Sequence, residues 1–123
     1  EDAADEARAA VQRAEDARAP RHVAKGLLLL GLAQVSFGTD EAVATLRRSA
    51  TFAESLGVLP LVWPSRALLG ALLAEGTSDQ DRTESDRSIA AARSAVLAIA
   101  GDLPPGVRAE WLARPDITAL LEG

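Results

Sequence analysis

Apolar residues recur at intervals of three and four along almost the whole chain, and no segment alternates them convincingly with period two. This spacing places them on one face of a helix, whereas a half-buried strand requires alternation. Alanine and leucine supply most of the hydrophobic residues, which make up 48% of the chain, and both lose little freedom in a helix. We therefore predict an all-α chain whose 123 residues form one domain with a modest core.

Glycine and proline divide the N-terminal half into three predicted helices. The first ends before Pro20, and the second, apolar on most sides and so expected to be buried, ends at Gly38. The third begins with Thr39 as its N-cap, followed by two acidic residues in the first turn, and ends at Gly57. Its predicted buried face consists of Ala42, Leu46, Ser49, Ala50 and Ala53.

The C-terminal half begins with a fourth predicted helix, whose start is bracketed by Pro60 and Pro64. Residues 76–85 are polar and are predicted to form a lengthened loop. A fifth helix follows and ends at Gly101.

Composition excludes several classes of function. The net charge is −5 and no basic block occurs, so we expect no nucleic-acid binding. The apolar runs are too short to span a bilayer, and the acidic N-terminus does not resemble a signal peptide. Without cysteine there is no disulfide framework, and we expect a cytoplasmic protein. Because the chain does not begin with Met, we expect it to be a piece of a longer protein.

Candidate chemical groups are few. His22 is the only histidine and is predicted to be exposed in a turn between helices, with no second imidazole or thiol available for a metal site. Asp79 and Asp81 suggest a calcium loop, but Glu84 and Ala90 stand where an EF-hand needs Gly and Glu. No phosphate-binding glycine motif occurs. We therefore predict no catalytic residue, no cofactor and no metal, and expect that the protein is not an enzyme.

The helical segments repeat. Asp5 aligns with Asp40 and Leu30-Gly31 with Leu69-Gly70, which gives periods of 35 and 39 residues, typical of helix-turn-helix solenoids. In each repeat the glycine is expected to let the next helix cross closely. The chain thereby resembles the tetratricopeptide repeat family, although Gln34 and Leu73 stand at its usual aromatic positions. The residues that match are Leu30, Gly31, Gly38, Ala42, Leu46, Ser49, Leu69, Gly70 and Gly76.

This resemblance implies antiparallel helix pairs stacked as a short superhelix with a C-terminal cap. Residues 1–19 would be the second helix of a preceding repeat, 21–57 and 60–101 two repeats, and 104–123 the cap. The residues expected to seal the stack are Val107, Trp111, Leu112, Ile117, Leu120 and Leu121, and those expected beneath them include Ile89, Val96, Leu97 and Ile99.

The closing segment also resembles the tail of such repeats in large bacterial regulators that join an NTPase module to a helical region. The implied function is a non-catalytic interaction module of a transcriptional or signalling regulator, binding a protein partner or another domain of its parent chain. A homo-oligomerising domain, such as a homodimer, is the first alternative, and a DNA-binding output domain the second. The expected partner groove is mostly apolar, and the same positions would also suit a covered core. The groove residues are Lys25, Leu28, Leu32, Val35, Ser36, Ala67 and Ala71, with Pro64 and Ala74 alongside.

Overall fold

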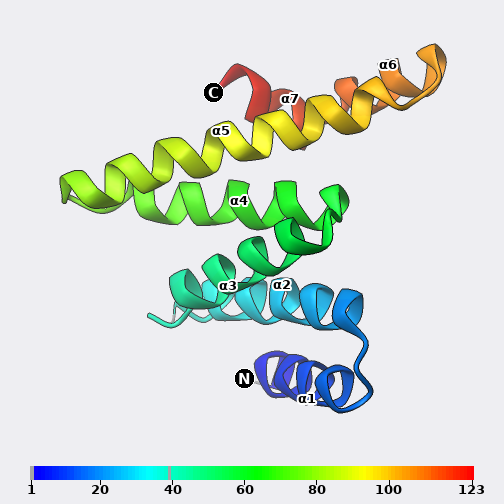
Figure 1. The fold of residues 1–123 in the computed structure, drawn as a ribbon. Helices are drawn as coiled ribbons and strands as arrows, with labels where there is room; N and C mark the ends of the chain where they lie inside the picture. The colour runs from blue at the N-terminus through cyan, green and yellow to red at the C-terminus, as the bar shows by residue number, and fades with distance from the viewer. Residues whose placement is uncertain (1, 39) are drawn as a thin grey trace.

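The computed structural model describes residues 2–38 and 40–123 (Figure 1). Helices α1 to α5 lie one on the next, with connections that alternate between the two sides of the stack, and α6 and α7 lie against α5. No strand occurs within the described ranges, so the all-α prediction is confirmed. The helices are α1 Asp2–Asp16, α2 Pro20–Ser36, α3 Ala42–Leu56, α4 Leu59–Ala74, α5 Asp79–Gly101, α6 Pro105–Ala113 and α7 Pro115–Glu122.

Two glycines end helices as predicted. Gly38 follows α2 with φ of 68° and Gly57 follows α3 with φ of 70°, a left-handed conformation that side chains disfavour. The predicted N-cap Thr39 lies outside the described residues. Within them, α3 begins at Ala42, with Glu41 as an N-cap that makes no side-chain capping hydrogen bond.

The prediction of a loop over residues 76–85 is right for residues 76–78 and wrong from residue 79 onward. Helix α5 begins at Asp79, because Ser78 caps it by accepting a hydrogen bond of 3.0 Å from the backbone N–H of Asp81. Both aspartates lie in the first turn, where the helix dipole favours negative charge. Ser85 is buried and donates to the Gly70 carbonyl at 2.7 Å, which ties this polar stretch to α4.

Close helix crossings occur at three glycines. A Cβ atom added to any of them would lie 2.5–2.8 Å from a side-chain carbon of the facing helix, closer than carbon atoms approach. The close approach predicted for Gly31 and Gly70 is therefore confirmed, and Gly26 adds a third. The three pairs are Val11 with Gly26, Leu46 with Gly31, and Ile89 with Gly70.

The buried face of α3 agrees with the prediction at every position. It includes one polar contact, between the hydroxyls of Ser49 and Ser65, whose oxygens are 2.8 Å apart. Either hydroxyl could donate in this contact, since each also has a backbone carbonyl within reach: that of Leu61 for Ser65, at 2.8 Å, and that of Ala24 for Ser49, at 3.5 Å. Around it lie two clusters of buried apolar residues that join neighbouring helices: Leu28, Leu46, Leu69 and Leu73, and Ala24, Ala53, Val62 and Ala95.

The C-terminal segment packs on α5 through a few residues. Ile117 of α7 is fully buried. The indole of Trp111 donates to the Val96 carbonyl at 3.2 Å and meets Trp63 edge to face, with ring centroids 6.0 Å apart. Val107, predicted to be buried, is 50% exposed, although the next residue, Arg108, donates to the Ala100 carbonyl of α5 at 2.8 Å.

The residues expected beneath the segment also differ in part from the prediction. Val96 is fully buried and Ile89 and Ile99 are partly buried, but Leu97 is 53% exposed. Leu97 follows Val96 directly on α5, so it points away from the face that α6 and α7 cover.

Replacing Gly70 with leucine should destabilise the fold, because the new side chain would overlap Ile89. We expect a loss of about 1–3 kcal/mol in the free energy of unfolding. The control is Gly106→Leu, where no neighbouring atom lies within 4 Å of an added Cβ and helix propensity favours leucine. Equal thermal midpoints for the two variants would contradict a close crossing at Gly70.

Truncating Ile117 should test whether α7 is an integral part of the fold. Ile117→Ala should lower the free energy of unfolding by about 2–5 kcal/mol, since the side chain is fully buried. Val107→Ala removes a half-exposed side chain and should cost less than about 0.5 kcal/mol. Urea unfolding monitored by tryptophan fluorescence measures both, and similar small losses would show that α7 is loosely attached.

Candidate functional site

The predicted groove residues divide into two sets. Leu28 is buried in the cluster with the α4 leucines and Val35 packs against it, so these two belong to the core, because their side of α2 faces α4. Ala67 on α4 is half-buried. The exposed members of the set are Lys25, Leu32 and Ser36 on α2 and Ala71 on α4.

One exposed stripe runs along α2. Its members are separated by three, four, three and four residues, which places them on one face of the helix. Leu29 is 48% exposed and Leu32 40%, both large values for leucine on a helix that is otherwise mostly buried. Sequence reasoning missed Leu29, since four consecutive leucines leave open which of them faces solvent. We name these residues the α2 stripe: His22, Lys25, Leu29, Leu32 and Ser36.

A hollow of about 350 Å3 lies beside the α2 stripe, between α1 and α2. One wall is formed by Ala10 and Ala14 of α1 and by Ala17 and Ala19 of the turn that follows, and the other by Gly26 and Leu29 of α2. Three side chains that carry or can carry positive charge complete its lining: Arg13, His22 and Lys25. The prediction that His22 lies in a turn is wrong, because α2 already begins at Pro20, but its exposure is confirmed.

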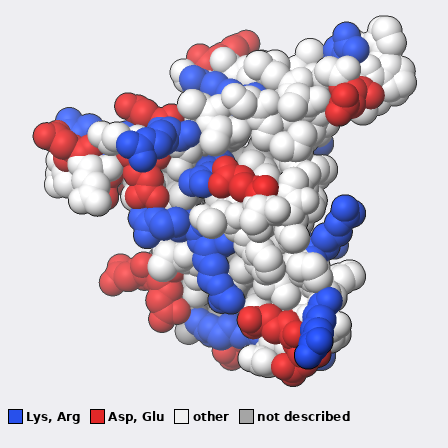
Figure 2. Space-filling view, viewed as in Figure 1, with Lys and Arg blue, Asp and Glu red and all other residues white. Residues whose placement is uncertain are grey.

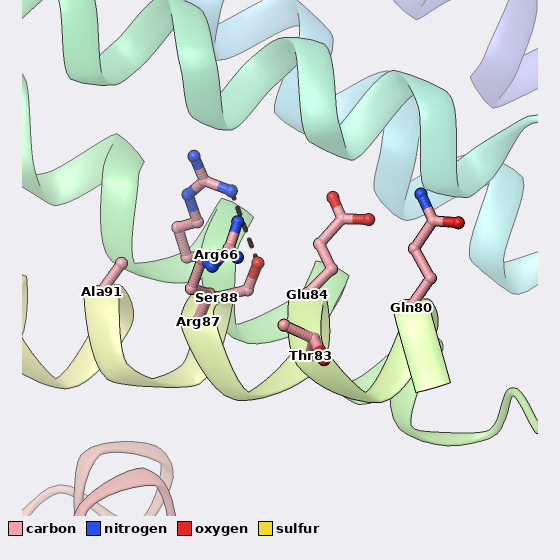
Figure 3. A pocket seen from close by; sticks show the side chains of 7 residues that line it. All are labelled: Arg66, Gln80, Thr83, Glu84, Arg87, Ser88 and Ala91. Atoms are coloured by element: carbon pink, nitrogen blue, oxygen red, sulfur yellow. Dashed lines mark hydrogen bonds between the residues drawn. The ribbon is translucent and has the colours of Figure 1, made fainter. Parts of the chain in front are cut away.

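A second hollow, of about 680 Å3, lies beside α4 and α5 (Figure 3). Figure 3 shows Arg66 of α4 pointing toward Ser88 of α5, and their side chains are 3.4 Å apart. Arg66 also pairs with Glu54 of α3 through two hydrogen bonds. The other residues that line it are Gln80, Thr83, Glu84, Arg87 and Ala91.

The charges at this hollow bind α3 to α5. Arg47 donates two hydrogen bonds, of 2.7 and 2.8 Å, to the carboxylate of Glu84. These hydrogen bonds hold the pKa of Glu84 below its usual value and raise the pKa of Arg47. The charged side chains at this surface therefore hold neighbouring helices together: Arg47, Arg66 and Glu84.

Metal-binding groups do not assemble in the described part of the chain. No set of three His, Cys, Asp or Glu side chains there could hold a metal ion. Asp79 and Asp81, the aspartates of the calcium pattern, lie in the first turn of α5.

The rest of the surface carries charges of both signs. Figure 2 shows acidic and basic side chains interspersed over the viewed face, without a continuous field of one sign. None of the helices in residues 2–38 and 40–123 is long and apolar enough to cross a membrane.

Comparison of the chain with family models, with curated proteins and with solved structures finds no match. The resemblance to tetratricopeptide repeats, and the division of the chain into repeats, therefore stay predictions.

Removing the Glu84 carboxylate should have a small, pH-dependent effect on stability. Because the pKa of Glu84 is lower in the folded chain, the pair with Arg47 contributes fully to the free energy of unfolding above the usual glutamate pKa of about 4.3. This contribution is lost as the pH falls through the pKa that Glu84 has in the folded chain. At pH 7 Glu84→Gln should cost less than about 1 kcal/mol, because the pair is partly exposed.

Urea unfolding of the native protein and Glu84→Gln from pH 7 to pH 3 measures this difference. The matched control is Glu110→Gln, which removes an exposed carboxylate from α6. A difference between native protein and Glu84→Gln that persists unchanged at the lowest pH would contradict a role for the ionised pair.

Proposed function

We propose that this chain is a non-catalytic helical-repeat module that binds a protein partner through the α2 stripe. The observation that carries the proposal is the pair Leu29 and Leu32, which expose 48% and 40% of their surface on one line of a helix. Apolar side chains spaced in this way fit the apolar face of another helix, which would bury them.

The repeated arrangement of the helices supports the tetratricopeptide-like part of the proposal. Gly31 of α2 and Gly70 of α4 align in the sequence repeat, and a branched side chain of the next helix packs over each of them, Leu46 of α3 and Ile89 of α5. Ion pairs also join residues a similar distance apart in sequence: Arg8 with Glu41, Glu15 with Arg48, and Arg47 with Glu84. We further propose, from the sequence resemblance, that the module belongs to a bacterial transcriptional or signalling regulator.

A displayed library of helical peptides selected against the protein tests the proposed function. We expect enrichment of peptides with an apolar stripe, and Leu32→Asp should weaken their binding at least about tenfold through loss of apolar contact. Leu97→Asp is the control, because Leu97 on α5 is 53% exposed, more than Leu32, and lies outside the α2 stripe. Failure to enrich any peptide, or equal sensitivity to both substitutions, would contradict the proposal.

The homo-oligomer is the alternative, and the spacing of Leu29 and Leu32, typical of seams between helices, favours it. Sedimentation velocity distinguishes the two functions. A monomer that binds the selected peptides supports the interaction module, whereas a dimer that Leu32→Asp dissociates supports self-association.

A further inference from the structure

Unpaired positive charge is concentrated around the turn between α1 and α2. Across residues 2–38 and 40–123, most Lys and Arg side chains take part in a hydrogen bond or an ion pair. The side chains that take part in none are Arg13, Arg18, Arg21 and Lys25, all near this turn, and Arg87 on α5. On a chain of net charge −5, unpaired cations are therefore gathered mainly in one place.

The carboxylates nearest in sequence are already engaged. Glu15 pairs with Arg48 of α3, and Asp16 accepts a hydrogen bond of 2.9 Å from Gln12. Arg13 and Lys25, which line the hollow between α1 and α2, thus have no acidic partner within the described chain. An external carboxylate could pair with them without breaking an existing ion pair.

Helix α1, beside this hollow, is covered by fewer helices of the described chain than its counterpart α3. Leu46 of α3 packs over Gly31 of the preceding helix and also contacts Leu69 and Leu73 of the following one. Its counterpart Val11 packs over Gly26 of the following helix, in a cluster with Ala14, Val23 and Leu27 against which Phe52 of α3 also packs. Within residues 2–38 and 40–123, α1 packs mainly on α2, whereas α3 packs on both α2 and α4.

The small residues that line the hollow between α1 and α2 allow a helix to approach it. The walls include Ala10, Ala14 and Ala17, whose size lets a helix backbone approach closely, and Leu29 projects beside them. A concave wall of alanines has no large apolar side chains to insert into a bilayer, so its shape favours a helix over a lipid surface.

We propose that the hollow between α1 and α2 binds an amphipathic helix of a second polypeptide, with Asp or Glu residues flanking its apolar stripe. The apolar stripe lies on the alanine wall and Leu29, and the carboxylates pair with Arg13 and Lys25. This inference rests on the proposed function, because it uses the same exposed side of α2, and it adds the charge and the position of the partner.

Two designed peptides test the charge requirement. Both are helices of about five turns with a leucine stripe, flanked in one by Glu and in the other by Lys. Fluorescence anisotropy should show that the Glu peptide binds about tenfold more tightly, and that added salt weakens its binding. Equal affinities of the two peptides, or no binding of either, would overturn the proposal.

Substitutions in the protein locate the site. Arg13→Glu combined with Lys25→Glu should abolish the preference for the Glu peptide or reverse it. Arg87→Glu is the matched control, since Arg87 is also unpaired but lies on α5, and it should leave binding unchanged. Far-ultraviolet circular dichroism checks that each variant keeps its helices. A double variant that is folded and keeps the original preference would overturn the proposal.

Other occupants of the hollow give distinct outcomes. Binding to vesicles of anionic phospholipid that the Glu peptide fails to displace would show that the unpaired cations bind a membrane surface and not a helix. Self-association that Arg13→Glu with Lys25→Glu abolishes would place a second copy in the hollow. Either result would overturn the proposal. If library-selected peptides respond to Leu32→Asp but not to charge reversal, the proposed function stands and this inference fails.

Discussion

Close contact between a branched side chain and a glycine of the adjacent helix sets the spacing of the stack. It occurs between α1 and α2, between α2 and α3, and between α4 and α5. Since alanine supplies much of the core, individual side chains bury little area, and stability requires the helices to approach closely. Glycine at a crossing costs about 1 kcal/mol of helix propensity relative to alanine, a cost that tighter packing offsets.

Helix α2 is central to this arrangement because two of the three glycines belong to it. Gly26 faces α1 and Gly31 faces α3, while Leu28 of the same helix packs against α4. Contacts on three sides leave a single stripe of α2 exposed, and that stripe contains Leu29 and Leu32. The surface proposed to bind a partner is therefore held by a helix that packs against three others, which limits its movement on binding.

Patterns within a single helix were predictable, whereas arrangements between helices were much less so. The face of α3 followed from residue spacing, because only one side of that helix is apolar. Residues 79–85 were misread as a loop, since their polar composition concealed a capped helix with its buried face lined by serine. The unpaired state of Arg13 and Lys25 depends on carboxylates that become neighbours only on folding, so no local pattern indicates it.

The buried hydroxyl pair of Ser49 and Ser65 has a consequence for how α3 and α4 align. Two helices faced with alanine and leucine can slide past each other by one turn and still bury similar apolar surface. Such a slip would break the 2.8 Å contact between the two hydroxyls and leave Ser49 with only the longer, 3.5 Å contact to the Ala24 carbonyl of α2, at a cost of about 0.5–1.5 kcal/mol. The two serines therefore favour one alignment of α3 on α4 that apolar packing alone would not select.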